Sequence, residues 1–172
     1  RKIAVATICL IVIAGSAAIW RVTKQRSVQR KLADDARAAR ECRARAQQGD
    51  VASQSELAGR YFEGNGVPRD YSEAVQWARK AADQGSALAE WMIGRLYFDG
   101  KGVIRDFTEA ATWFRKATGE GLPVAQWDLA IMYYRGYGVT KDLAAARAWL
   151  QKAAARGYTP ANEMLARLDA AN

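Results

Sequence analysis

The chain has no histidine, and it has only two cysteines among its 172 residues. Without histidine and without clustered cysteines, the sequence excludes a Cys/His zinc site and a histidine-based catalytic triad. Two cysteines are too few for a disulfide framework, and they lie far apart, Cys9 in an apolar run and Cys42 in a charged one. We therefore expect no metal site, no cofactor and no enzymatic activity.

Acidic residues are scarce at the N-terminal end. The formal net charge of the chain is +8, and residues 1–45 hold eleven Lys or Arg against three acidic residues. From residue 46 onward there are 15 basic and 15 acidic residues, so this part of the chain is neutral. Because affinity for nucleic acid comes from clustered Lys and Arg, we expect no nucleic-acid partner.

Proline is rare, with three residues, whereas glycine recurs at a fixed interval. The stretch from Leu57 to Gly85 returns twice, each time 36 residues later. The recurring positions are Tyr61, Tyr97 and Tyr133; Gly64, Gly100 and Gly136; Asp70, Asp106 and Asp142; Trp77, Trp113 and Trp149; and the longer series Gly49, Gly85, Gly121 and Gly157. A fixed period of about 20 to 50 residues indicates a solenoid of supersecondary units.

Each repeat predicts two helices. The first runs from about Ala52 to Glu63 and ends at Gly64, since glycine tolerates the left-handed conformation of a helix C-cap. Asp70 is the expected N-cap of the second helix, and Glu73 is placed to complete a capping box.

The second helix of each repeat carries alanines and one tryptophan on a single face. In the first repeat these are Ala74, Trp77, Ala78 and Ala81. The small alanines let the paired helix come close, and we expect the tryptophan to fill the groove between repeats. Gly85 is the predicted end of this helix.

The predicted fold class is therefore all-α. We expect an α/α superhelix, a right-handed solenoid, built from three helix pairs and a capping helix. The three pairs occupy residues 49–84, 85–120 and 121–156. Residues 157–172 hold one more helix of the first type, from Pro160 to Leu168, and we expect it to cap the open end.

The repeat pattern resembles the Sel-one-like repeat family, whose members are related to the tetratricopeptide repeat. The fullest copy consists of Ala89, Ile93, Gly94, Tyr97, Gly100, Gly102, Val103, Asp106, Ala110, Trp113, Lys116 and Ala117. The resemblance covers residues 46–172, with departures at Ser53, Ala58 and Ala130. It implies an α/α superhelix that binds proteins as an adaptor and carries no catalysis.

Residues 3–20 form an uncharged run of eighteen residues, which predicts a transmembrane anchor within residues 1–20. The rival interpretation is a cleaved signal peptide with its cleavage site at residues 16–18. Two basic residues precede the run and five follow it closely, so the positive-inside rule places the repeats in the cytoplasm. Many relatives implied by the resemblance are exported, which favours the periplasm of a bacterial cell instead.

Residues 21–48 lack proline and are rich in Arg, Ala, Gln and Lys, which predicts a basic helical stalk between the anchor and the repeats. The alternative is a solvated connector whose last turns pack on the first repeat. Its first basic residues, Arg21, Lys24 and Arg26, are expected to lie near the lipid headgroups. An anionic leaflet attracts Lys and Arg at that distance.

Partner-binding residues are expected on the first helices, which line the inner face in related superhelices. The candidates are Arg60, Trp91, Met92, Arg95, Trp127, Asp128 and Met132. Trp91 and Trp127 are one repeat apart and are predicted to stack as neighbours. Aromatic residues and Arg are favoured binding anchors, although both tryptophans could equally serve the core of the repeats.

Two functions follow from these observations. The first is a single-pass adaptor of the bacterial inner membrane, or an accessory subunit of a larger membrane complex, with protein partners. The second is an exported periplasmic binding protein with a regulatory role that has lost its signal peptide.

Overall fold

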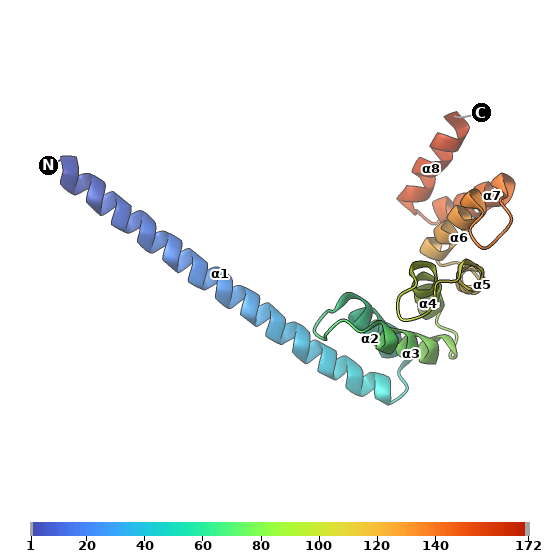
Figure 1. The fold of residues 1–172 in the computed structure, drawn as a ribbon, viewed down its shortest axis with the longest axis horizontal. Helices are drawn as coiled ribbons and strands as arrows, with labels where there is room; N and C mark the ends of the chain where they lie inside the picture. The colour runs from blue at the N-terminus through green and yellow to red at the C-terminus, as the bar shows by residue number, and fades with distance from the viewer. Residues whose placement is uncertain (1, 171–172) are drawn as a thin grey trace.

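The computed structural model describes residues 2–170, and for residues 2–19, 21 and 22 it describes the backbone alone. The described chain folds into eight α-helices and contains no strand. The helices are α1 (Lys2–Gln47), α2 (Val51–Glu63), α3 (Tyr71–Ala82), α4 (Ala87–Asp99), α5 (Phe107–Ala117), α6 (Pro123–Arg135), α7 (Leu143–Ala155) and α8 (Thr159–Ala170). Helices α2 to α7 stack as three antiparallel pairs, and α1 extends far beyond them as a single straight helix (Figure 1).

The side chains of the predicted anchor, residues 3–20, lie outside the described ones except for Trp20. In the part of the chain whose side chains are described, no helix has the length and apolarity needed to cross a membrane.

The turn inside each repeat confirms the predicted N-cap but not the predicted capping box. The Asp70 side chain accepts hydrogen bonds from the backbone N–H groups of Ser72 and Glu73, at 2.9 and 3.1 Å. The Glu73 carboxylate instead accepts the indole N–H of Trp77 at 3.0 Å. The backbone N–H of Asp70 donates to the Tyr61 carbonyl at 3.0 Å, because the turn brings it to the open end of the preceding helix.

The second helices end before the glycine that was predicted to terminate them. In the first repeat α3 ends at Ala82, and Gly85 lies in the following turn with a φ of 85°. This left-handed conformation lets the backbone N–H of Ser86 reach back to the Ala81 carbonyl at 3.1 Å. The glycine therefore shapes the turn into the next repeat.

The residue after each tryptophan fills the core of its repeat. Phe114 is fully buried, and its ring lies where a Cβ on Gly94 would come within 2.6 Å of it. Trp113 is only partly buried, and the Lys116 ammonium covers its ring at 4.1 Å. The tryptophan was expected to fill the groove between repeats, and Trp113 does pack, half-buried, against the core cluster of the first repeat. The fully buried ring of this repeat is the neighbouring Phe114.

The size of that core residue explains two of the departures from the family pattern, Ala58 and Ala130. The three pairs of facing positions are Ala58 with Ala78, Gly94 with Phe114, and Ala130 with Leu150, and all six residues are buried. Glycine occurs only opposite the bulky phenylalanine ring, and alanine occurs where the facing side chain is smaller. In each repeat the residue on the first helix is thus small enough for the side chain that faces it from the second helix.

The last turns of α1 belong to the solenoid. Ala39, Cys42 and Ala46 are buried, and Cys42 and Ala46 belong to the core cluster of the first repeat. Each Gly-x-Gly-Val loop, spanning residues 64–67 in the first repeat, follows a first helix and contacts the helix that precedes that first helix. Gly66 lies against the Asp35 carbonyl of α1, as Gly102 lies against Tyr71 of α3 and Gly138 against Phe107 of α5. Arginines follow the same spacing, because Arg43, Arg79 and Arg115 donate to Tyr61, Tyr97 and Tyr133 respectively. Residues 35–47 therefore take the position of the second helix of a preceding pair.

Residues 35–47 of α1 also form the polar outer surface at this end of the solenoid. Glu41 and Arg45 are exposed at the positions where the next second helix has the buried Trp77 and Ala81. A polar outer face is typical of the terminal units of solenoids. At the other end α8 packs on α7 through Ala161 and forms the predicted capping helix.

Candidate functional site

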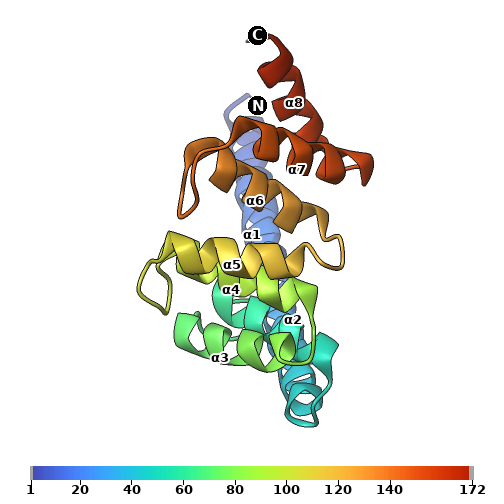
Figure 2. The same ribbon diagram turned by 90° about the vertical axis from the view of Figure 1, so that its right-hand side faces the viewer.

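The first helices α2, α4 and α6 lie on the side of the solenoid that faces α1, and the second helices lie on the opposite side (Figure 1). We call the surface of α2, α4 and α6 on that side the inner face. Figure 2 shows the helices stacked in chain order along the solenoid, so residues 36 apart lie on successive layers.

A polar link joins α4 to α6 on the inner face. The Trp91 indole N–H donates to Asp128 Oδ2 at 2.7 Å. Arg95 lies 3.8 Å from the other carboxylate oxygen of Asp128 and 3.7 Å from Asp99. Burial raises the pKa of Asp128 above its ordinary value, and the Trp91 hydrogen bond opposes that rise only in part.

A pocket of about 300 Å³ opens beside this link. Its lining consists of Arg95, Phe98, Phe114, Trp127, Asp128 and Ile131. The walls are therefore apolar rings and an isoleucine, with one carboxylate and one guanidinium. Such a combination is typical of a site that takes an apolar group and orients it by a few polar contacts.

The predicted partner-binding residues divide into three groups: four at the pocket, two methionines in the core, and one arginine apart from both. Arg95, Trp127 and Asp128 line the pocket, and Trp91 joins them through its hydrogen bond to Asp128. Trp91 and Trp127 do not stack on each other within the described chain, because Trp127 packs against Tyr158 with ring centroids 5.9 Å apart.

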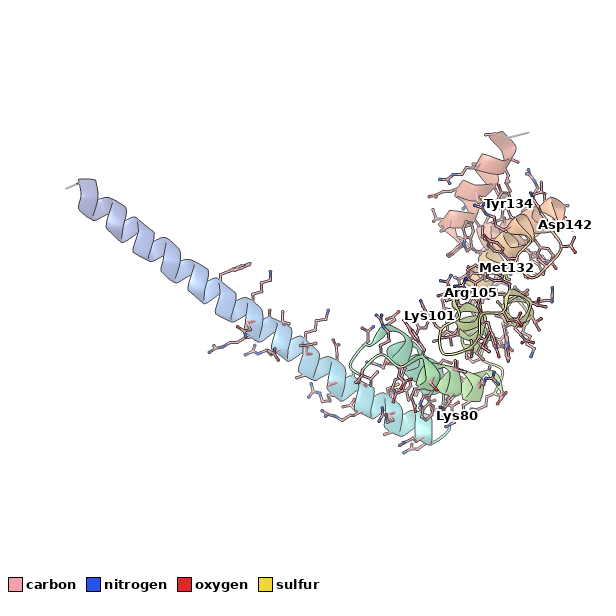
Figure 3. The ribbon with its side chains drawn as sticks, viewed as in Figure 1. Lys80, Lys101, Arg105, Met132, Tyr134 and Asp142 are labelled. Carbon is pink, nitrogen blue, oxygen red and sulfur yellow. The ribbon has the colours of Figure 1, made fainter. Side chains whose placement is uncertain are left out.

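Both predicted methionines lie in the core. Met132 is fully buried within the repeats (Figure 3), and Met92 is almost fully buried over Gly59. Their side chains therefore contribute packing between layers and little accessible surface.

Arg60 lies apart from the pocket, on α2. Its guanidinium donates two hydrogen bonds to Glu56, at 2.8 and 2.9 Å. It faces an open groove of about 450 Å³ between α2 and α1, lined also by Lys31 and Asp35. Apart from Gly59, the residues that line this groove are polar or charged, in contrast to the aromatic residues of the pocket between α4 and α6.

The structure describes the side chains of two of the three basic residues that were predicted to lie near the membrane. Lys24 and Arg26 are exposed, and the Lys24 ammonium lies 4.7 Å above the exposed Trp20 ring. Figure 3 shows the described side chains of this half of α1 with no other element beside them. The side chain of Arg21 lies outside the described ones.

Sequence reasoning missed Phe98, Phe114 and Ile131, although they are half of the residues that line the pocket. Gly94 was the available signal, because it is the one member of the series Ala58, Gly94 and Ala130 without a side chain. The missing side chain at Gly94 leaves room for the ring of Phe114.

Cys42 offers no reactive site. It is fully buried, and its thiol donates to the Ser53 carbonyl at 3.3 Å. Burial raises the pKa of the Cys42 thiol, which disfavours the reactive thiolate. The part of the chain with described side chains also holds no group of three or more His, Cys, Asp or Glu that could bind a metal ion.

Comparison with known proteins supports the repeat pattern. Residues 51–86, 87–122 and 123–158 match the Sel1 repeat, and none of the curated proteins matches the chain. These matched units start two residues later than the sequence predicted.

Three solved structures share the fold. A protective antigen of uropathogenic Escherichia coli strains is 37% identical with a TM-score of 0.70; the match covers 76% of this chain but only 28% of the antigen. A Sel1 repeat protein from Oxalobacter formigenes is 38% identical with a TM-score of 0.67, over 76% of this chain and 98% of that one. Cysteine-rich protein B from Helicobacter pylori is 24% identical with a TM-score of 0.61, over 74% of this chain and 96% of that one, which shows the fold alone.

These matches agree with the helix pairs described above. Sel1 repeats form scaffolds for contacts between proteins. The chain belongs to the Sel1 repeat family.

Proposed function

We propose that this chain is an adaptor that binds a protein partner on the inner face, at α4 and α6. The observation that carries the proposal is the pocket of about 300 Å³ beside two partly buried tryptophans and Arg95. Tryptophan and arginine are the residue types that most often dominate binding energy at protein interfaces. The other described hollows of the chain are more open and more polar.

We further propose that residues 3–20 anchor the chain in a membrane as a single span, with the bacterial inner membrane as the expected location. The run has no charged residue, and α1 continues from Lys2 to Gln47 without a break. Arg21, Lys24 and Arg26 then follow at the height of the lipid headgroups. The excess of basic residues after the run favours the cytoplasmic side for the repeats.

The stalk would set the distance between the repeats and the membrane. Asp35, where the first loop contacts α1, lies fifteen residues beyond Trp20. At 1.5 Å per residue this holds the first repeat about 22 Å from the end of the anchor. Such a spacing suits an accessory subunit that reaches a partner domain standing above the bilayer.

The membrane proposal is tested by extraction and by mass. The full chain is expected to stay with membranes in alkaline carbonate, and its intact mass is expected to include residues 3–20. A mature protein that lacks about the first 18 residues and washes off the membrane would establish the alternative, an exported periplasmic protein with a regulatory role.

Partner binding is tested by crosslinking in native membranes followed by mass spectrometry. Arg95→Glu, on the inner face, is expected to abolish the crosslinks of α4 and α6 to the partner. Arg105→Glu is the charge-matched control, because it lies on the loop between α4 and α5 (Figure 3) and is expected to keep them. Equal crosslinking of both variants would show that the inner face is not the binding surface.

A further inference from the structure

One position on the first helices changes character from layer to layer. The residues 36 apart at this position are Glu56 on α2, Met92 on α4, Asp128 on α6 and Met164 on α8. In α4 the residue is long and apolar, and Met92 Cε lies 3.9 Å from where a Cβ on Gly59 would be. The groove between α2 and α4 is therefore filled by a methionine of the chain itself.

The groove between α4 and α6 lacks such a filling side chain. Asp128 is shorter than methionine, and its carboxylate is held by the Trp91 indole N–H at 2.7 Å. The pocket of about 300 Å³ lies beside it, between rings of Phe98, Phe114 and Trp127. The empty space thus lies where the neighbouring layer places its methionine.

The rim of the pocket keeps hydrogen-bond donors available. Arg95 lies 3.7 and 3.8 Å from its two carboxylate neighbours, which is longer than a hydrogen bond, and 38% of its side chain is exposed. Within the described chain the Arg95 guanidinium donates no hydrogen bond. A backbone carbonyl of a bound segment could accept from this guanidinium without displacing another acceptor.

The charges around the pocket select against ionic ligands. Asp99 and Asp128 flank Arg95 and repel an anion. A cation would compete with Arg95 for the same carboxylates, inside a wall that is otherwise made of apolar rings. A neutral apolar group is the ligand that these surroundings favour.

We propose that the pocket between α4 and α6 receives one unbranched apolar side chain of about the size of methionine from a partner segment, whose adjacent backbone carbonyl accepts from Arg95. This inference rests on the proposed function, because it names the chemical feature by which a partner would be recognised on the inner face. The incoming side chain would complete the layer as Met92 completes the layer below.

The test uses the full chain labelled with 5-fluorotryptophan, since ¹⁹F spectra report on its six tryptophans even in detergent micelles. The probe is N-acetyl-methionine methylamide, and N-acetyl-alanine methylamide is the matched short probe. The methionine probe is expected to shift the Trp127 signal, assigned with Trp127→Phe, and the alanine probe to bind at least about tenfold more weakly.

Two methionine substitutions separate the pocket from the rest of the inner face. Asp128→Met fills the pocket from within and is expected to abolish the shift. Glu56→Met places the same side chain at the equivalent position of α2, away from the pocket, and is expected to bind the probe like the unmodified protein. If Asp128→Met does not fold by circular dichroism, Ile131→Phe narrows the pocket from its other wall and serves the same purpose.

The inference is overturned if the Trp127 signal does not respond to the methionine probe, if both probes bind equally, or if the pocket-filling variant still binds. These outcomes leave the crosslinking test of Arg95→Glu untouched, so failure of the pocket and failure of the inner face as a binding surface give different results.

Discussion

The first and second repeats have closely similar sequences but complete their cores in different ways. The first repeat has Ala58 opposite Ala78 and takes additional core residues, Cys42 and Ala46, from α1. The second repeat supplies its own bulk through Phe114 against Gly94. The comparison teaches that the first repeat takes core residues from the stalk, whereas the second carries a bulky ring of its own, shares its core with Leu129 and Met132 of α6, and leaves a pocket toward α6.

The largest expected effect comes from removing the part of α1 that serves the first repeat. A fragment of residues 49–172 is expected to lose roughly 3–6 kcal/mol of unfolding free energy relative to residues 33–172, because Leu57 and Tyr61 lose their cover. Urea unfolding followed by circular dichroism measures the loss, and hydrogen exchange should locate it in α2.

The matched control for that truncation is a fragment of residues 23–172. It adds only residues 23–32, whose side chains are all exposed, so it is expected to be as stable as residues 33–172. If residues 49–172 were equally stable, the assignment of the end of α1 to the solenoid would be wrong.

The next effect concerns the bulk inside the second repeat. Phe114→Ala is expected to cost about 3–5 kcal/mol, the usual range for deleting a buried aromatic ring. Trp113→Ala is expected to cost less than half of that, because its ring is partly exposed and covered by Lys116. Urea unfolding of both variants in residues 33–172 makes the comparison, and a larger loss for Trp113→Ala would contradict the packing described above.

A smaller effect tests the matching of volumes. Gly94→Ala is expected to cost roughly 1–3 kcal/mol, because the new Cβ would lie 2.6 Å from the Phe114 ring. Combining it with Phe114→Leu recreates the Ala130 and Leu150 pair of the third repeat. The double mutant is therefore expected to lose less unfolding free energy than the two single mutants lose together. Strict additivity in the double-mutant cycle would refute the pairing.

The smallest effect depends on pH. The native pKa of Asp128 is raised by burial above its ordinary value of 3.8, so its ionised form costs stability in the folded chain. That cost is absent below pH 3.8 and grows as the pH rises through the native pKa. Asp128→Asn keeps an acceptor for the Trp91 indole and carries no charge.

Asp128→Asn is therefore expected to be more stable than the unmodified chain at pH 7, with a difference that shrinks toward zero in acid. Thermal unfolding at several pH values measures this difference. A difference that grows as the pH falls would reverse the sign and would show that the ionised carboxylate stabilises the link between α4 and α6.

The fold could be predicted from the sequence because the sequence signals are local and repeated. The 36-residue period, the left-handed glycine that ends the first helix and the aspartate N-cap each act within a few residues of the chain, and the structure contains all of them. Four of the seven predicted site residues also lie at or beside the pocket, because they lie on α4 and α6, the first helices of successive repeats.

The remaining features depend on contacts between layers, which no local pattern specifies. Glu73 does not cap the Asp70 N–H, because the turn brings that N–H to the Tyr61 carbonyl, and the Glu73 carboxylate accepts from the Trp77 indole instead. Met92 and Met132 have the same apolar character as surface anchors, and only the packing of neighbouring helices shows that they are buried.

By itself, the sequence determined an all-α repeat solenoid, its period and its helix caps, since these follow from residue types at fixed spacing. It also determined that the chain is neutral from residue 46 onward. Only the tertiary structure decided that residues 35–47 act as a second helix, that Phe114 and not Trp113 fills the core, and that Asp128 leaves a pocket. Each of these outcomes is set by the volume of side chains from different layers meeting in one place, and the sum of those volumes is fixed when the layers stack.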